Sequence, residues 1–241
     1  MELLRLTTLY LLSFTLLLHG LHAADPLWHT CSSPKNYTAN GPFNNNLNQL
    51  LSSLPTKVSV KGFGIGSVGK RPDQANGLAL CRGDVSSSDC KTCLVGAISD
   101  VRDLCPYKEE AVIWFDNCLL RYSNDNFFGK IDTVNGFYMW NTQSVDDPAM
   151  FNQKTREFLH HLSLDAYLNP LMYASGDMDI GKHEKLYGLA QCTRDLSSGD
   201  CKKCLESAIG ELPACCDGKK GGRVIGGSCN IRYELYPFVN A

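Results

Sequence analysis

GLALCRGDVSSSDCKTCL at residues 77–94 recurs as GLAQCTRDLSSGDCKKCL at residues 188–205, with 12 of 18 residues identical. The offset of 111 residues extends to cysteines beyond this stretch: Cys81, Cys90, Cys93, Cys105 and Cys118 recur as Cys192, Cys201, Cys204, Cys216 and Cys229. Self-similarity at a fixed period is the signature of a repeated structural unit. The chain therefore contains two copies of a unit the size of a small domain, and their junction lies in the stretch 123–136.

Each copy has a readable pattern of helices and strands. Phe43, Leu47, Leu50, Leu51 and Leu54 follow Pro42 at helical spacing, and Phe151, Phe158, Leu159 and Leu162 repeat this pattern in the second copy. A second helix follows Ser86–Ser88, and its counterpart follows Ser197 and Ser198. We expect strands at 57–61, 77–82, 111–115 and 119–122. The fold class is thus α+β, with two tandem modules that each pack two helices on a small antiparallel β-sheet.

Composition narrows the possible functions. The 241 residues are 44% hydrophobic and 20% charged, and 23 basic residues face 25 acidic ones for a net charge of −2. A chain with this balance has no basic field for a phosphate backbone or an anionic membrane surface. We therefore expect no nucleic-acid partner.

The N-terminal stretch predicts the compartment. Residues 1–23 contain Arg5, an apolar run of about 11 residues and the small residue Ala23, which is the pattern of a secretory signal peptide. No run approaches the ~18 apolar residues of a membrane span, so we expect secretion without membrane insertion. The predicted domains are residues 24–130 and 136–241.

The cysteines indicate disulfides. All 12 lie after the predicted cleavage site, and an even number in an oxidising compartment favours disulfides over thiol or metal chemistry. The two C-x-x-C pairs, Cys90/Cys93 and Cys201/Cys204, are too far apart for paired zinc knuckles and lack the βαβ setting of a redox motif. Asn36-Tyr37-Thr38 is a sequon and predicts glycosylation at Asn36.

Both copies carry the spacing C-x8-C-x2-C, which resembles the plant ginkbilobin-homologous, or stress-antifungal, module. Two such modules behind a signal peptide resemble the plant cysteine-rich repeat secretory proteins. The stretch SCNIRYELYPF at residues 228–238 also resembles the second module of this family. The resemblance covers nearly the whole chain after the signal peptide.

The resemblance implies a disulfide pattern. The implied pairs are Cys81–Cys90, Cys93–Cys118, Cys31–Cys105, Cys192–Cys201 and Cys204–Cys229. The second copy has no cysteine at the Cys31 position, close to Trp140, and instead has adjacent Cys215 and Cys216. A vicinal disulfide, a bridge to another chain or two free thiols would each balance the count, and we favour the vicinal disulfide.

No catalytic pattern is present, so we predict neither an enzyme nor a cofactor or metal requirement. The histidines after the predicted cleavage site are His29, His160, His161 and His183, and none has metal or triad spacing. The GKKGG stretch at 218–222 lacks the order of a phosphate loop and reads as a turn. The repeated acids Asp84/Asp195 and Asp89/Asp200 stand near helix starts, where capping explains them.

The resemblance also implies a mannose site in the second module only. Family modules that bind mannose use an asparagine, an arginine and a glutamate, which here correspond to Asn141, Arg223 and Glu234. A carboxylate accepts, a guanidinium donates and an amide does both, which suits sugar hydroxyls. The first copy has Ser32, Val112 and Ser123 at these positions. The alternative is a cross-strand ion pair between Arg223 and Glu234, with Asn141 in a turn.

The strands at 111–115 and 119–122 are strongly apolar in the first copy. If Trp114 or Phe115 faces away from its own core, we expect these strands to contact the second copy or a partner protein.

Together these features predict a secreted, non-enzymatic defence protein of the plant apoplast with antifungal activity. Its expected partners are mannose-type glycans of fungal walls or glycoproteins. The alternative is a protein-interaction module that binds a cell-surface receptor or a secreted defence enzyme and no sugar.

Overall fold

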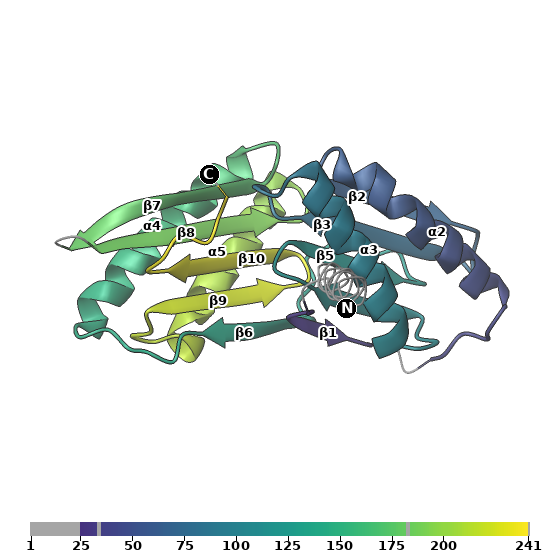
Figure 1. Cartoon of the computed structure of the whole chain (residues 1–241), viewed down its shortest axis with the longest axis horizontal. Coiled ribbons are helices and arrows are strands. Elements are labelled where there is room, and N and C mark those ends of the chain that lie inside the picture. The colour runs from purple at the N-terminus through teal and green to yellow at the C-terminus, as the bar shows by residue number, and fades with distance from the viewer. Residues whose placement is uncertain (1–24, 33–34, 182–183, 241) are drawn as a thin grey trace, which may run out of the picture.

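The computed structural model describes residues 25–32, 35–181 and 184–240, and within them the chain forms two modules of the same topology (Figure 1). The first module has a five-stranded antiparallel sheet in the order β1-β4-β5-β3-β2. Its elements are β1 (Trp28–Thr30), α2 (Pro42–Ser59), β2 (Phe63–Val68), β3 (Ala75–Cys81), α3 (Ser87–Leu104), β4 (Glu110–Trp114) and β5 (Cys118–Ser123).

The second module repeats this arrangement with the order β6-β9-β10-β8-β7. Its elements are β6 (Gly136–Trp140), α4 (Pro148–Leu168), β7 (Tyr173–Gly181), β8 (Glu184–Cys192), α5 (Ser198–Cys215), β9 (Gly221–Gly226) and β10 (Cys229–Glu234). In both modules the two helices cover one face of the sheet, which confirms the α+β class.

The helices begin where the sequence predicts. Pro42 and Pro148 occupy the first turns of α2 and α4, where a missing backbone N–H costs nothing. The hydroxyls of Ser86 and Ser197 accept hydrogen bonds from the backbone N–H groups of Asp89 and Asp200, and so cap α3 and α5. The apolar faces of these helices are buried against the sheets in one core per module.

Two sequence-based predictions were wrong in detail. The expected strand at 57–61 is the end of α2 and its cap, because Val58 is fully buried in the helix–sheet core and helical packing outweighs the alternating pattern. The strand instead follows as β2, in a glycine-rich stretch. Asp84 and Asp195 are not helix caps: Asp84 binds Arg82 and the backbone N–H of Asn240, and Asp195 accepts from the backbone N–H of Gly129.

The disulfides in the described part of the chain are those that the resemblance implied, together with a vicinal pair. The pairs are Cys31–Cys105, Cys81–Cys90, Cys93–Cys118, Cys192–Cys201, Cys204–Cys229 and Cys215–Cys216. The strand register shows which residue of the second module stands at the position of Cys31. Thr30 pairs with Val112 and Met139 pairs with Arg223, so the next residue is Cys31 in one module and Trp140 in the other.

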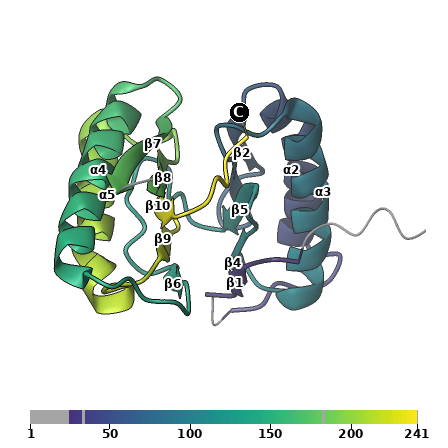
Figure 2. The same ribbon diagram turned by 60° about the vertical axis from the view of Figure 1, so that its left-hand side comes forward.

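The sheets face each other across the junction, and the helices lie on the outer sides (Figure 2). Trp114 is 3% exposed and packs with Leu78, Leu80 and Ile225, and its indole N–H donates to the Gly226 carbonyl over 3.1 Å. The apolar strands of the first module therefore contact the second copy through Trp114. Phe115 points the other way and belongs to the first module's own core.

The predicted signal peptide at residues 1–23 lies outside the described residues. Within the described ranges, none of the helices combines the length and apolar content needed to cross a membrane.

Candidate functional site

Asn141, Arg223 and Glu234 line one cavity of about 360 Å³ at the junction of the two modules. Asn141 follows β6, Arg223 lies in β9 and Glu234 ends β10, and these three strands are neighbours in the sheet. Pairing of the strands thus gathers residues that are up to 93 positions apart in the sequence. The rest of the lining comprises Leu27, Asp116, Met139, Trp140, Gly222, Arg232 and Tyr236.

Arg223 is buried and already has partners. Its Nη1 donates to Asp116 Oδ1 over 2.8 Å, and its Nε donates to Asn230 Oδ1 over 3.1 Å. Burial lowers the pKa of the guanidinium to about 10, because the opposing attraction of Asp116 is smaller than the loss of hydration. Arg223 thus belongs to a polar network that spans both modules.

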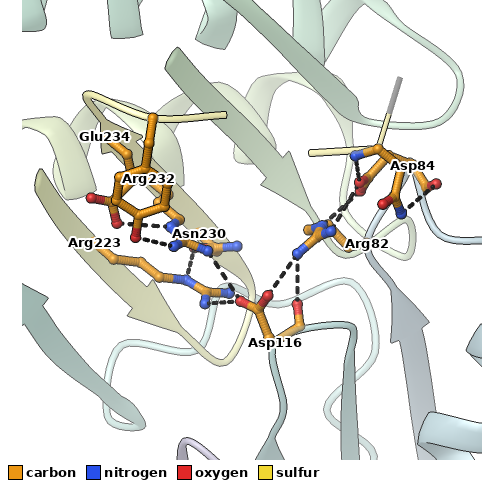
Figure 3. Close-up of polar contacts among 9 residues, drawn as sticks. Arg82, Asp84, Asp116, Arg223, Asn230, Arg232 and Glu234 are labelled. Atoms are coloured by element: carbon orange, nitrogen blue, oxygen red, sulfur yellow. Dashed lines mark hydrogen bonds and ion pairs between the residues drawn. The ribbon is translucent and has the colours of Figure 1, made fainter. Parts of the chain in front are cut away.

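Asp116, in the turn between β4 and β5 of the first module, is the centre of that network (Figure 3). Its carboxylate accepts from Arg223 at 2.8 Å, from Arg82 at 2.9 Å and from Arg232 at 3.2 Å. Burial by itself raises the pKa of Asp116, but the three guanidinium groups outweigh it and hold that pKa below the ordinary 3.8. The Asp116 side chain is nevertheless 44% exposed, while that of Arg223 is 9% exposed.

Glu234 pairs with Arg232 and not with Arg223. Glu234 Oε1 accepts from Arg232 Nε over 3.1 Å. In the register of β9 and β10, Arg223 lies opposite Arg232, and Glu234 lies opposite Gly221. A Cβ at Gly221 would overlap Glu234 Oε2, so glycine at this position leaves room for the carboxylate. The direct Arg223–Glu234 ion pair considered from the sequence is therefore wrong.

Asn141 is held in a turn at the rim of the cavity. Its Oδ1 accepts from the backbone N–H of Gln143 over 2.9 Å, and its own backbone N–H donates to the Gly221 carbonyl over 2.9 Å. The alternative to a mannose site, as predicted from the sequence, also placed Asn141 in a turn. The side-chain NH₂ keeps donor capacity for a ligand.

Aromatic side chains form the open rim. Trp140 is 54% exposed and Tyr236 is 48% exposed, and Arg232 Nη2 donates to the Tyr236 hydroxyl over 3.2 Å. The sequence indicated Trp140 only as the residue that replaces a cysteine. It did not predict Asp116, Arg232 or Tyr236 as site residues. For Asp116 the repeat gives no signal, because the residue 111 positions later is Gly227.

The cavity is lined mostly by polar and aromatic side chains. It offers carboxylates, guanidinium groups, an amide and an exposed indole, and among the described residues that line it there is no serine, cysteine or histidine nucleophile. Within the described ranges, one group of side chains has the spacing of metal ligands, namely His29, Cys31 and Cys105. Its two cysteines form a disulfide and are not thiolates.

Comparison with known proteins gives relatives along most of the chain. An antimicrobial ginkbilobin-2-like protein of Castanea crenata is 59% identical over 230 residues, covering 95% of both chains. Cysteine-rich repeat secretory protein 38 of Arabidopsis thaliana is 53% identical over 216 residues, covering 88% of this chain and 85% of the relative.

Solved structures show the same tandem arrangement. The tandem DUF26 ectodomain of the Arabidopsis thaliana cysteine-rich receptor-like protein PDLP8 matches with a TM-score of 0.76 and 30% identity, covering 88% of this chain and 98% of that one. The PDLP5 ectodomain from the same plant matches with a TM-score of 0.73 and 28% identity, covering 88% and 100%. The salt stress response/antifungal family model matches residues 30–125 and 140–236. The chain therefore belongs to the salt stress response/antifungal family and carries two tandem copies of its domain.

Proposed function

We propose that this protein is a secreted, non-catalytic defence protein whose second module binds mannose-type glycans, with antifungal activity as the outcome. The observation that carries the proposal is that Asn141, Arg223 and Glu234 line one cavity beside the exposed indole of Trp140. Relatives with names such as antimicrobial ginkbilobin-2-like protein and cysteine-rich repeat secretory protein support the defence role and the secretion.

The chemistry of the cavity suits a neutral saccharide. Sugar hydroxyls donate to carboxylates and accept from guanidinium and amide groups, while the apolar C–H face of a pyranose packs on an exposed indole. Few hydroxyls can be engaged at an open rim, so binding of one sugar is weak. A millimolar dissociation constant corresponds to about 4 kcal/mol. Useful retention then requires repeated sugars, as in a fungal wall polymer or a glycoprotein.

Calorimetric titration of the oxidised full chain with mannose and mannan tests this function. We expect the parent to bind mannan, and Trp140→Ala and Asn141→Ala each to weaken binding by roughly three- to tenfold. Trp28→Ala is the matched control, because Trp28 is equally exposed, at 54%, but does not line the cavity. A folded parent that binds neither mannose nor mannan contradicts the proposal.

The compartment and the glycosylation belong to the same proposal. Secretion to the plant apoplast would expose the chain to glycosylation at Asn36, and Asn36 is exposed where it forms an isolated bridge with Lys108. A mass difference that is removed by a peptide N-glycosidase, and absent from Asn36→Gln, would establish the modification.

A second function is favoured by the edge of the second sheet. β6 pairs only with β9 in the described sheet, and its residues Tyr138, Met139 and Trp140 are 44%, 40% and 54% exposed. An exposed apolar edge strand is a surface for another protein. A receptor or a secreted defence enzyme bound there would lose affinity with Tyr138→Lys, because Tyr138 lies on β6 outside the cavity lining, whereas mannan binding by the cavity would require Asn141.

A further inference from the structure

The cavity contains two carboxylates, and they are not equally accessible. The side chain of Glu234 is 11% exposed and that of Asp116 is 44% exposed. Glu234 Oε1 is taken by Arg232, and Oε2 points at the backbone of Gly221. Glu234 thus lines the cavity, but both of its carboxylate oxygens lie against atoms of the second module.

Asp116 keeps acceptor capacity on its exposed side. An ionised carboxylate has about four acceptor positions. Among the described residues, Arg223 and Arg232 donate to Oδ1 and Arg82 donates to Oδ2, which leaves room for a further hydrogen bond at Oδ2. The same arginines keep the group charged at physiological pH, since they lower its pKa. Hydrogen bonds to a charged acceptor are the stronger ones.

We infer that Asp116 of the first module, rather than Glu234, is the carboxylate that accepts hydrogen bonds from saccharide hydroxyls in this cavity. The inference rests on the proposed glycan binding and makes the site a composite of both modules. Leu27 also reaches the cavity from the first module. The second module supplies Asn141, the remaining N–H groups of Arg232 and the indole of Trp140.

A composite site has a consequence for affinity. Asp116 is held in place by Arg223 and Arg232 across the junction, so the acceptor is correctly placed only while the modules are docked. Glu234 then acts as a positioning residue, because it orients Arg232 and does not itself contact the ligand.

The test compares Asp116→Asn with Glu234→Gln in the oxidised full chain, titrated with methyl α-mannoside and mannan. Asparagine keeps the size of the side chain but removes the charge. We expect Asp116→Asn to weaken binding about tenfold or more, because a charge-assisted hydrogen bond is lost. Glu234→Gln should cause a clearly smaller loss. Equal losses in the two variants, or no loss in Asp116→Asn, overturn the inference.

Two further measurements separate contact with the ligand from structural support. Asp84→Asn removes a carboxylate of the same network, bound to Arg82 but absent from the cavity lining, and should lower stability without changing affinity. A set of monodeoxy mannosides identifies the hydroxyl involved: for the sugar that lacks the partner hydroxyl, Asp116→Asn should cause no additional loss. An equal loss for every deoxy sugar means that Asp116 only positions its neighbours.

The two proposals fail in different ways. If the folded parent binds no mannoside, the glycan function is wrong and the inference falls with it. If the parent binds and Trp140→Ala weakens binding while Asp116→Asn does not, only the inference is wrong.

Discussion

Arg82 and Arg223 are two almost fully buried cations that share the carboxylate of Asp116 at the module junction. Removing a partner from a buried ion pair leaves an uncompensated charge and costs more than an exposed pair contributes. Asp84 extends the network from Arg82 to the backbone of Asn240 near the C-terminal end. Single substitutions here change the stability of both modules together.

The first prediction is acid sensitivity of the folded state. The pKa values of Asp84 and Asp116 are lowered from 3.8, because the arginine partners, and for Asp84 also the backbone of Asn240, outweigh the effect of burial. Stability from a group with a lowered folded pKa is present above the unfolded value and is lost as pH falls through the folded value. We expect the melting temperature to fall below about pH 4, with a smaller fall in Asp116→Asn.

Circular dichroism melts from neutral to strongly acidic pH measure this dependence. Asp177→Asn is the control, because it removes a carboxylate from the exposed ion pair with Lys185, which solvent screens and which contributes little to stability. The prediction is wrong if Asp116→Asn loses as much stability in acid as the parent does.

At this scale the sequence predicted part of the candidate site. The family resemblance located Asn141, Arg223 and Glu234, which do line one cavity. The partners of these residues were not predictable from the repeat. Asp116 and Arg223 are 107 positions apart, and the geometry that joins them comes from the packing of one module on the other.

At the scale of elements, each sheet packs closely against its first helix at a glycine. The glycine of the repeated Gly-Leu-Ala stretch is Gly77 in β3 and Gly188 in β8. A Cβ on Gly188 would lie 2.6 Å from Phe158 and 2.7 Å from Leu162 of α4, and one on Gly77 would lie 2.9 Å from Leu50 of α2. The close helix–sheet contact therefore depends on the absence of a side chain.

The second prediction follows from this contact. Gly188→Ala should destabilise the protein by about 1–3 kcal/mol, because the added methyl group overpacks the core between β8 and α4. Gly210→Ala in α5 should instead stabilise it by about 0.5–1 kcal/mol, because no described atom beyond the chain neighbours and the helix's own backbone lies within 4 Å of the new Cβ, and alanine favours a helix. Denaturant unfolding of both variants checks the opposite signs, and a neutral Gly188→Ala would contradict the packing argument.

The sequence predicted long, strongly periodic elements better than short ones. Both helices of each module, and β3, β4 and β5, appear where apolar periodicity or strand propensity indicates them. β1 is three residues long, and β2 contains two glycines, so neither carries a strand signal of its own. Their positions come from pairing with β4 and β3, which is tertiary information.

At the scale of the whole molecule, the modules share a third apolar cluster between the sheets. It contains Trp114 and Leu119 of the first module, Phe127 of the segment that follows β5, and Ile225 of the second module. Polar contacts surround it, including Gln191 Nε2, which donates to the Cys81 carbonyl over 3.0 Å. Burial of this cluster links the folding of two modules that also have separate cores.

The third prediction concerns cooperativity. We expect the parent to unfold in one calorimetric transition, and Trp114→Ala to lose about 3–5 kcal/mol and to show two transitions, since each module keeps its own core. Val95→Ala, at a site 54% exposed on α3, should behave like the parent. A single transition in Trp114→Ala, or two in the parent, would show that the junction does not couple the modules.

The disulfides also bear on how the protein is made. Each pair joins cysteines of the same module, and no bridge in the described chain crosses the junction. During synthesis from the N-terminus, Cys118 emerges well before Cys192, so the first module can oxidise completely before a cysteine of the second is available. The order of synthesis thus favours pairing within the first module over pairing with the equivalent cysteines of the second.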